Sequence, residues 1–220
     1  MYYDLNKILS YNSFLNVIIG ERGSGKTYST SKFVTKKFIT NSDEFVYIRR
    51  YKSDLKKSIP KFFTALINNN EFPDHTLSYK GDNFIIDDKV AGYAITLTMA
   101  QSLKSTNFPN VKYIIFDEFI LENDGHRHYL QNEVEVFLGL VETIARMRDV
   151  KIFLLGNAVT ITNPYFIFFD ISLPYICFRF HSLFAPPENN SSLQVREHPC
   201  SNRALPFFLP LRYIPHRSFV

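Results

Sequence analysis

The segment Gly20–Thr27 constrains the fold of this chain more than any other feature. It fits the pattern G-x-x-x-x-G-K-[ST] at every fixed position, and an apolar run at 14–19 precedes it. Glycines allow successive backbone N–H groups to point at one anion, and a helix that starts there adds its positive end. The sequence therefore predicts a phosphate-binding loop between a buried strand and a helix, made of Gly20, Glu21, Arg22, Gly23, Ser24, Gly25, Lys26 and Thr27.

Two side chains of this loop have expected roles. Lys26 would reach the β- and γ-phosphates of a nucleotide, and the Thr27 hydroxyl would ligate Mg²⁺. The alternative is a glycine-rich turn with a chance lysine. The strand before the loop and the helix after it disfavour that alternative.

Strand and helix patterns alternate through the first three quarters of the chain, which is typical of an α/β fold. Such alternation predicts a mainly parallel sheet with helices on both faces. The expected strands are 14–19, 45–49, 113–116 and 151–155, the expected helices are 26–39, 59–69 and 132–148, and a hairpin or meander is expected at 76–98.

Two carboxylates, Asp117 and Glu118, follow the apolar strand at 113–116. In nucleoside triphosphatases with this loop, the first acid after such a strand helps to hold Mg²⁺. Neighbouring residues on an extended chain point to opposite sides, so we expect Asp117 to face the metal and Glu118 to point elsewhere. There Glu118 could orient and deprotonate an attacking water. A solvated strand end is the alternative interpretation.

Several polar residues allow two interpretations, one functional and one structural. Asn157 ends the strand at 151–155, where it either bonds a phosphate or water or simply makes a turn. Arg146 and Arg148 either complement the dipole of the helix at 132–148 or include an arginine that acts on a neighbouring subunit. The basic run at 49–52, with Lys56 and Lys57, either contacts nucleic-acid phosphates or is a solvated face. Spacing alone does not interpret Lys104, and His126 and His128 are expected to be surface loop residues.

Composition limits the number of domains and the class of protein that the chain can form. The chain has 220 residues and two cysteines, so we expect one domain, with nothing that favours a disulfide scaffold. No apolar run reaches about 18 residues and no signal peptide is evident, which predicts an intracellular protein without a membrane span. The formal net charge is +4, but five basic residues follow Asp170, so charge is weak support for a nucleic-acid footprint on the body.

Composition changes near residue 175. Every lysine lies at or before Lys151, whereas six of the eleven prolines fall between Pro186 and Pro215. We therefore expect residues 1–175 to form the nucleotide-binding domain and 176–220 to be a poorly specified, proline-rich tail without a clear period.

The order of several sequence blocks resembles the DNA-encapsidation (genome-packaging) ATPases of small short-tailed phages with protein-primed linear genomes. The resemblance covers about residues 8–170. The blocks are 8–11 (ILSY), 20–27, 45–52 (FVYIRRYK), 71–75 (EFPDH), 91–95 (AGYAI), 108–111 (FPNV), 116–119 (FDEF), 132–134 (NEV), 157–159 (NAV) and 163–166 (NPYF).

The resemblance implies a fold class, an activity and partners. The fold would be a P-loop NTPase of the additional-strand, catalytic-glutamate type, with the loop as Walker A and Asp117 as the Walker B acid. The activity would be ATP hydrolysis, with ATP and Mg²⁺, coupled to pumping double-stranded DNA into a prohead. The implied partners are a homo-oligomeric ring, typically a pentamer, the portal (connector) and a packaging RNA. The location would be the portal vertex in the host cytoplasm.

The resemblance also assigns site residues. Lys26, Thr27, Asp117 and Glu118 take the roles given above. Arg146 falls where the family has a trans-acting arginine, and Lys104 where a second trans-acting basic residue is expected. The expected metal ligands are Thr27 and Asp117, and the expected catalytic residues are Lys26, Lys104, Glu118, Arg146 and Asn157.

The chain departs from the family after residue 175. Family members continue into a nuclease-like second domain, which 176–220 does not resemble, so we expect a truncated product or a tail read in another frame. The alternatives to a packaging ATPase are another DNA translocase or helicase, a nucleotide kinase, and a nucleotide-gated assembly module.

Overall fold

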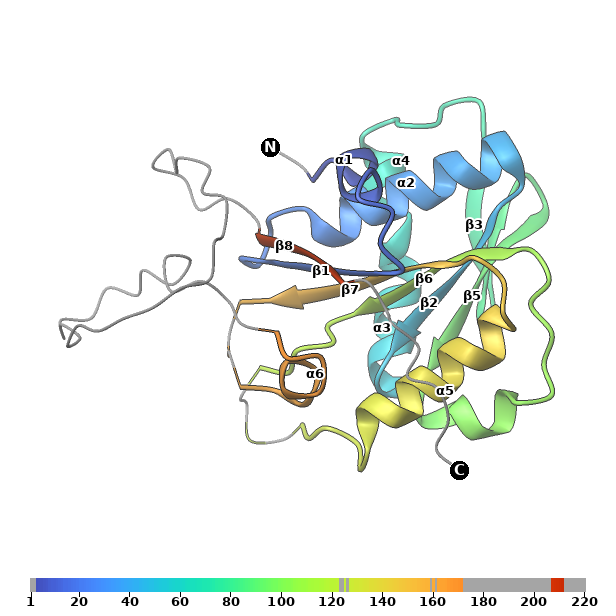
Figure 1. Cartoon of the computed structure of the whole chain (residues 1–220). Coiled ribbons are helices and arrows are strands. Elements are labelled where there is room, and N and C mark those ends of the chain that lie inside the picture. Colours follow the sequence, from blue (N-terminus) through green and yellow to red (C-terminus); the bar gives the residue numbers. More distant parts are fainter. Residues whose placement is uncertain are drawn as a thin grey trace, which may run out of the picture.

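The computed structural model describes residues 3–122, 125, 127–158, 160 and 162–171, and the backbone of Phe207–Leu211. These residues form one mixed sheet with helices on both faces (Figure 1). The strands are β1 (Leu15–Gly20), β2 (Glu44–Arg49), β3 (Leu77–Lys80), β4 (Asn83–Ile86), β5 (Lys89–Thr96), β6 (Val111–Asp117), β7 (Lys151–Asn157) and β8 (Phe207–Leu211). The helices are α1 (Leu5–Leu9), α2 (Lys26–Asn41), α3 (Lys52–Phe62), α4 (Thr64–Asn68), the 3₁₀ helix η1 (Leu97–Leu103), α5 (Glu133–Ala145) and α6 (Pro164–Phe168).

The strand order is β3-β4-β5-β2-β6-β7-β1-β8. The five strands from β5 to β1 are parallel, while β3, β4 and β8 pair antiparallel with their neighbours. This confirms the prediction of a mainly parallel sheet. The parallel strands end at one edge, where ligands bind in such sheets. β7 lies between β1, which leads into the Gly20–Thr27 loop, and β6, which ends in Asp117.

Two apolar layers hold the helices against the sheet. Phe33, Phe45 and Phe62 belong to the layer that packs α2 and α3 on one face. Phe116, Phe137 and Tyr165 belong to the layer that packs α5 and α6 on the other. Figure 1 shows α2 above the sheet and α5 below it. The expected helices on both faces are thus confirmed.

Two helices differ from their predicted bounds. The helix predicted at 59–69 is two helices, and the first begins at Lys52 because Leu55, Ile59 and Phe62 form one buried stripe at helical spacing. The helix predicted at 132–148 ends at Ala145, because Arg146 adopts a left-handed conformation with φ 44° that ends the helix. Arg146 and Arg148 therefore lie beyond the last turn rather than inside it.

The tail contains one element that its composition did not indicate. The backbone of β8 pairs antiparallel with β1, with Pro210 opposite Asn16. Proline is tolerated there because β8 lies at the edge of the sheet. The rest of the tail beyond Ile171 lies outside the described residues, so the boundary at 175 stays a prediction.

Among the described helices, none combines the length and apolar character that a membrane span requires.

Candidate functional site

The Gly20–Thr27 loop turns sharply between β1 and α2. Gly23 and Gly25 have φ values of 80° and 84°, which only glycine adopts without strain, and α2 begins directly after them. Lys26 is almost fully buried, and its ammonium donates to the carbonyls of Gly20 at 3.0 Å and Glu21 at 2.9 Å. The loop therefore surrounds a positive charge at the amino end of a helix, which favours anions.

Burial also acts on the charge of Lys26. Desolvation lowers the pKa of its ammonium, and the nearby Asp117 carboxylate opposes that shift. A bound phosphate would replace the bonds of Lys26 to loop carbonyls with charge-assisted ones, which are stronger.

Thr27 and Asp117 meet across the gap between α2 and the end of β6. The Thr27 hydroxyl lies 3.3 and 3.4 Å from the two carboxylate oxygens of Asp117. Tyr47 on β2 donates to Asp117 at 2.8 Å, and burial raises the pKa of this phenol well above its usual range, so it remains a donor. Hydroxyl and carboxylate oxygens are the donors Mg²⁺ prefers, so Thr27 and Asp117 fit a Mg²⁺ ion.

Glu118 does not point away from Asp117 as expected. It has a φ of 56°, which breaks the alternation of an extended strand, and both carboxylates line the same cleft. The Arg49 guanidinium donates to both, with Nη1 3.3 Å from Asp117 Oδ2 and Nη2 bonded to Glu118 Oε2. Arg127 adds a further contact, with its Nη1 4.0 Å from Glu118 Oε2. The two carboxylates thus face one charge-balanced site.

Arg49 and Arg50 leave the end of β2 on opposite faces of the sheet. Neither belongs to a solvated or nucleic-acid-binding face, because they are 7% and 3% exposed. Arg49 shares a face with Tyr47 and reaches the acidic pair, while Arg50 turns toward α5. Burial lowers the pKa of both guanidinium groups. The acidic side chains beside them, Tyr47 and the acidic pair for Arg49 and Glu133 for Arg50, raise it by more, so both groups remain charged.

Arg50 ties the acidic loop to α5. It donates to the backbone carbonyls of Glu118 at 3.1 Å and Phe119 at 2.7 Å, and it forms an ion pair with buried Glu133. Tyr165 donates to the same carboxylate at 2.8 Å, and burial raises the pKa of its phenol well above its usual range. Every oxygen of Glu133 therefore has a partner, which makes this network rigid.

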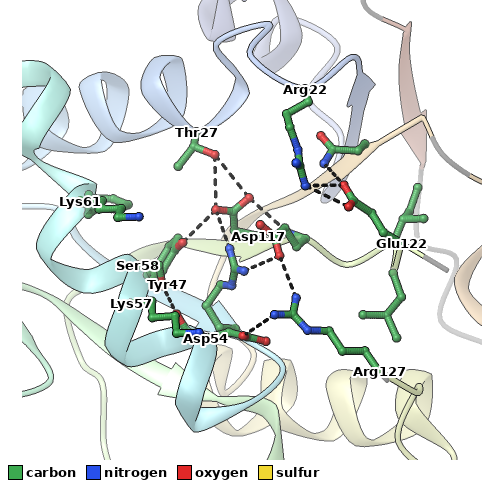
Figure 2. Close-up of a pocket in the computed structure, with 16 residues that line it drawn as sticks. Arg22, Thr27, Tyr47, Asp54, Lys57, Ser58, Lys61, Asp117, Glu122 and Arg127 are labelled. Atoms are coloured by element: carbon green, nitrogen blue, oxygen red, sulfur yellow. Dashed lines mark hydrogen bonds and ion pairs between the residues drawn. The ribbon is translucent and has the colours of Figure 1, made fainter. Parts of the chain in front are cut away.

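Two clefts open at the site and share Thr27, Asp117 and Glu118 among their walls. One, of about 390 Å³, extends over the phosphate loop from Arg22 to Tyr28. The other, of about 410 Å³, extends from the acidic pair toward α3 and Arg127 (Figure 2).

Asn157 lies at the site, as the end of β7 predicted. Its amide donates to Glu122 Oε1 at 3.1 Å, and Arg22 of the phosphate loop donates to both oxygens of Glu122 at 2.8 and 2.9 Å. Asn157 lines both clefts, so it is placed to contact a ligand there.

Arg146 and Lys104 lie at the opposite edge of the sheet. Arg146 precedes β7 and donates to the carbonyl of Thr106, which precedes β6. Lys104 ends η1 and is exposed beside this contact. A seven-residue strand separates the two edges by roughly 20 Å. These two residues therefore cannot reach the phosphate loop of their own chain, whereas their exposure leaves them open to a neighbouring one.

Arg148 stabilises the end of α5 and the loop before β6. Its guanidinium donates to carbonyls at the end of α5, including Ala145 at 3.0 Å, and to those of Phe108 and Pro109 in the loop before β6. It thus complements the carboxyl end of the helix, as one interpretation predicted.

The loop after β6 contains His126 and His128. His128 is exposed, as expected, and His126 lies outside the described residues. Within the described part of the chain, no cluster of three or more His, Cys, Asp or Glu side chains is arranged to hold a metal.

Sequence patterns missed Arg49, Tyr47 and Arg127 as residues of the site. The period of β2 places Tyr47 and Arg49 on one face, which is a visible signal. Their use depends on β2 lying beside β6, with Ile48 opposite Phe116. The sequence of neither strand by itself predicts that pairing.

The fold and the site define an α/β protein with a phosphate-loop motif and two carboxylates at the carboxyl edge of a mainly parallel sheet. Residues 1–185 match the family described as Podovirus DNA encapsidation protein (Gp16), and the chain belongs to that family. This confirms the resemblance seen in the sequence blocks.

Known relatives agree with this assignment. The DNA packaging protein of Bacillus phage phi29 is 45% identical over 172 residues, which are 78% of this chain and 51% of that protein. The crystal structure of the N-terminal domain of the DNA packaging ATPase from bacteriophage phi29 is 44% identical, with a TM-score of 0.71, over 83% of this chain and 92% of that domain. The bacteriophage phi29 viral genome packaging motor assembly contains a chain with the same identity and TM-score, of which 54% is covered. The chain thus spans about half the length of the relatives it matches.

Proposed function

We propose that this chain is the ATP-hydrolysing subunit of a motor that moves double-stranded DNA into a phage prohead. The observation that carries the proposal is the meeting of Thr27 and Asp117 at 3.3 Å, with Glu118 beside them. That arrangement joins a phosphate loop, a metal-binding pair and a candidate base in one site. The position of β7 between β1 and β6 supports the additional-strand, catalytic-glutamate class of P-loop NTPase.

In the proposed reaction the chain binds ATP through the Gly20–Thr27 backbone and the Lys26 ammonium. Mg²⁺ at Thr27 and Asp117 would neutralise charge on the β- and γ-phosphates. Glu118 accepts a proton from the water whose oxygen attacks the γ-phosphorus, and the bond to the β–γ bridging oxygen breaks. Arg49 holds the Glu118 carboxylate within the site, and Asn157 is placed to bond the γ-phosphate or the water.

The second part of the proposal concerns a neighbouring subunit. Arg146 and Lys104, exposed at the far edge, would act on the phosphates of the next chain in a homo-oligomeric ring. An arginine supplied in this way contributes about 10³–10⁵ in rate. The relative from the phi29 motor assembly supports a multisubunit motor. From the family resemblance of the sequence blocks we extend the proposal to a pentameric ring, the portal vertex and a packaging RNA as partners.

The test is ATP hydrolysis by mixed variants. Lys26→Ala loses nucleotide binding but retains Arg146, whereas Arg146→Ala retains an intact phosphate loop. Each alone should be inactive, and an equimolar mixture should recover activity because one variant supplies the arginine to the other. Activity should rise with protein concentration and with duplex DNA.

Lys112→Ala, an exposed lysine on β6, is the control and should behave like the unaltered chain. A hydrolysis rate that does not change with duplex DNA, with protein concentration or in Arg146→Ala would favour a kinase or a gated assembly module. Strand separation with a preference for single strands would favour a helicase.

A further inference from the structure

The cleft between the acidic pair and α3 shares Asp117 and Glu118 with the reaction described above, but its α3 wall takes no part in that reaction. It adjoins the phosphate-loop cleft through Thr27, Asp117 and Glu118, and its own walls come from α3, Tyr47 and Arg127. At about 410 Å³ it is large enough to hold a small anion with its water.

Most of the charges that line this cleft are paired. Arg22 pairs with Glu122, Arg49 pairs with the two acids of the site, and Arg127 donates to Asp54 at 3.0 Å. These contacts set three guanidinium groups against the four carboxylates of the walls, which leaves one net negative charge among the paired groups.

Two lysines of α3 turn that balance to one net positive charge. Lys57 and Lys61 both line the cleft, and in the described part of the chain neither side chain forms an ion pair or hydrogen bond. Their spacing of four residues places them one above the other on a single helix face. Figure 2 shows Lys61 extending from α3 toward the space beside Thr27 and Asp117.

We propose that this cleft is a second anion subsite, and that Lys57 and Lys61 bind inorganic phosphate there after it leaves the acidic pair. The inference rests on the proposed ATPase function, which supplies the phosphate beside Glu118. It adds a product site that stays open while the phosphate loop is filled.

The walls favour a small anion over a nucleic acid. A duplex presents a continuous row of phosphates, and four carboxylates in the cleft would repel such a polyanion. A single phosphate can lie against the α3 wall, near the two lysines and away from most of those carboxylates.

The experiment measures binding of radiolabelled inorganic phosphate to the full chain by equilibrium dialysis, with Mg²⁺ and a saturating non-hydrolysable ATP analogue. A single phosphate should bind in addition to the analogue. Lys57→Ala/Lys61→Ala should weaken that binding by about tenfold, since two exposed charge contacts are lost. Both lysines are exposed, and alanine favours helix, so the variant should fold.

Two variants serve as matched controls. Lys57→Arg/Lys61→Arg keeps the charges and should keep the binding. Lys52→Ala/Lys56→Ala removes two exposed lysines of the same helix that do not line the cleft, and should leave phosphate affinity unchanged.

Three outcomes would overturn the inference. They are no phosphate bound beside the analogue, equal weakening in the Lys52/Lys56 variant, and a short duplex that binds only when Lys57 and Lys61 are present and displaces the phosphate. Failure of the analogue to bind would count against the proposed ATPase function instead. Phosphate binding without the analogue would then still test the two lysines.

Discussion

The guanidinium of Arg50 and the carboxylate of Glu133 form a two-point ion pair, with Nε to Oε2 and Nη2 to Oε1 both at 2.7 Å. Both residues are almost fully buried, at 3% and 2% exposed. The pair joins the end of β2 to the first turn of α5, and the same guanidinium holds the backbone of Glu118. A buried pair of this kind fixes an arrangement because either partner alone would be a buried, uncompensated charge.

Glu133→Ala should therefore destabilise the chain strongly. Removing one partner of a buried ion pair costs about 3–5 kcal/mol. Chemical denaturation followed by circular dichroism would measure the free energy of unfolding. Glu135→Ala, an exposed glutamate of the same turn, should change it by less than about 0.5 kcal/mol. Equal stability of the two variants would contradict the rigid role given to the pair.

Glu118→Gln should slow ATP hydrolysis and leave nucleotide affinity nearly unchanged. Glutamine keeps the shape of the side chain but cannot accept the proton from water, a loss worth about 10²–10⁴ in kcat. Steady-state kinetics with a separate measurement of analogue binding would distinguish the two effects. Glu142→Gln, exposed on α5, is the control. A large fall in affinity with unchanged kcat would assign Glu118 to binding rather than to catalysis.

Lys26→Met should weaken nucleotide binding without destabilising the fold. Burial lowers the pKa of Lys26, so its charge is unfavourable in the folded chain, and the apolar methionine removes that burden. The stability cost of this charge is full below the lowered folded pKa and disappears as pH rises to the unfolded value of 10.5. Loss of charge-assisted bonds to phosphate should reduce affinity by about tenfold or more.

Calorimetric binding of an ATP analogue, together with thermal unfolding, checks both halves of that prediction. Lys36→Met, at an exposed position of α2, should alter neither quantity much. A clear fall in melting temperature in Lys26→Met alone would show that the lysine holds the loop together.

Asp87 should titrate differently when His75 is removed. A hydrogen bond from His75, at 2.6 Å, is the main cause that lowers the pKa of Asp87 below its ordinary 3.8, and the backbone N–H of Thr76 adds to it. The stabilising contribution is therefore full above the unfolded pKa and is lost as pH falls through the lowered folded value. NMR titration should show the Asp87 pKa rising toward 3.8 in His75→Ala. It should not move in His128→Ala, which lacks an exposed histidine elsewhere.

Local patterns predicted much of the fold and the places of several residues that lie together at the candidate site. The parallel sheet, its hairpin, the phosphate loop and the acids at the end of β6 all follow from apolar periods of known length and from glycine spacing. The predicted ends of helices and strands were less accurate than their positions. Helix α5 ends at Ala145 because Arg146 adopts a left-handed conformation. That conformation is uncommon for a residue other than glycine, so the sequence does not predict it.

The sequence by itself determined the loop with the phosphate-binding pattern and the acidic pair, because each lies within a few covalently linked residues whose spacing is fixed. Only the tertiary structure decided what surrounds them. The order of strands places β2 beside β6, so Arg49 meets Glu118 and Arg50 meets Glu133, although about seventy or more residues separate each pair in the chain. It also places Arg146 at the far edge, away from its own loop. Strand order is set by long-range packing of the two apolar faces, and that choice belongs to the whole chain rather than to any segment of it.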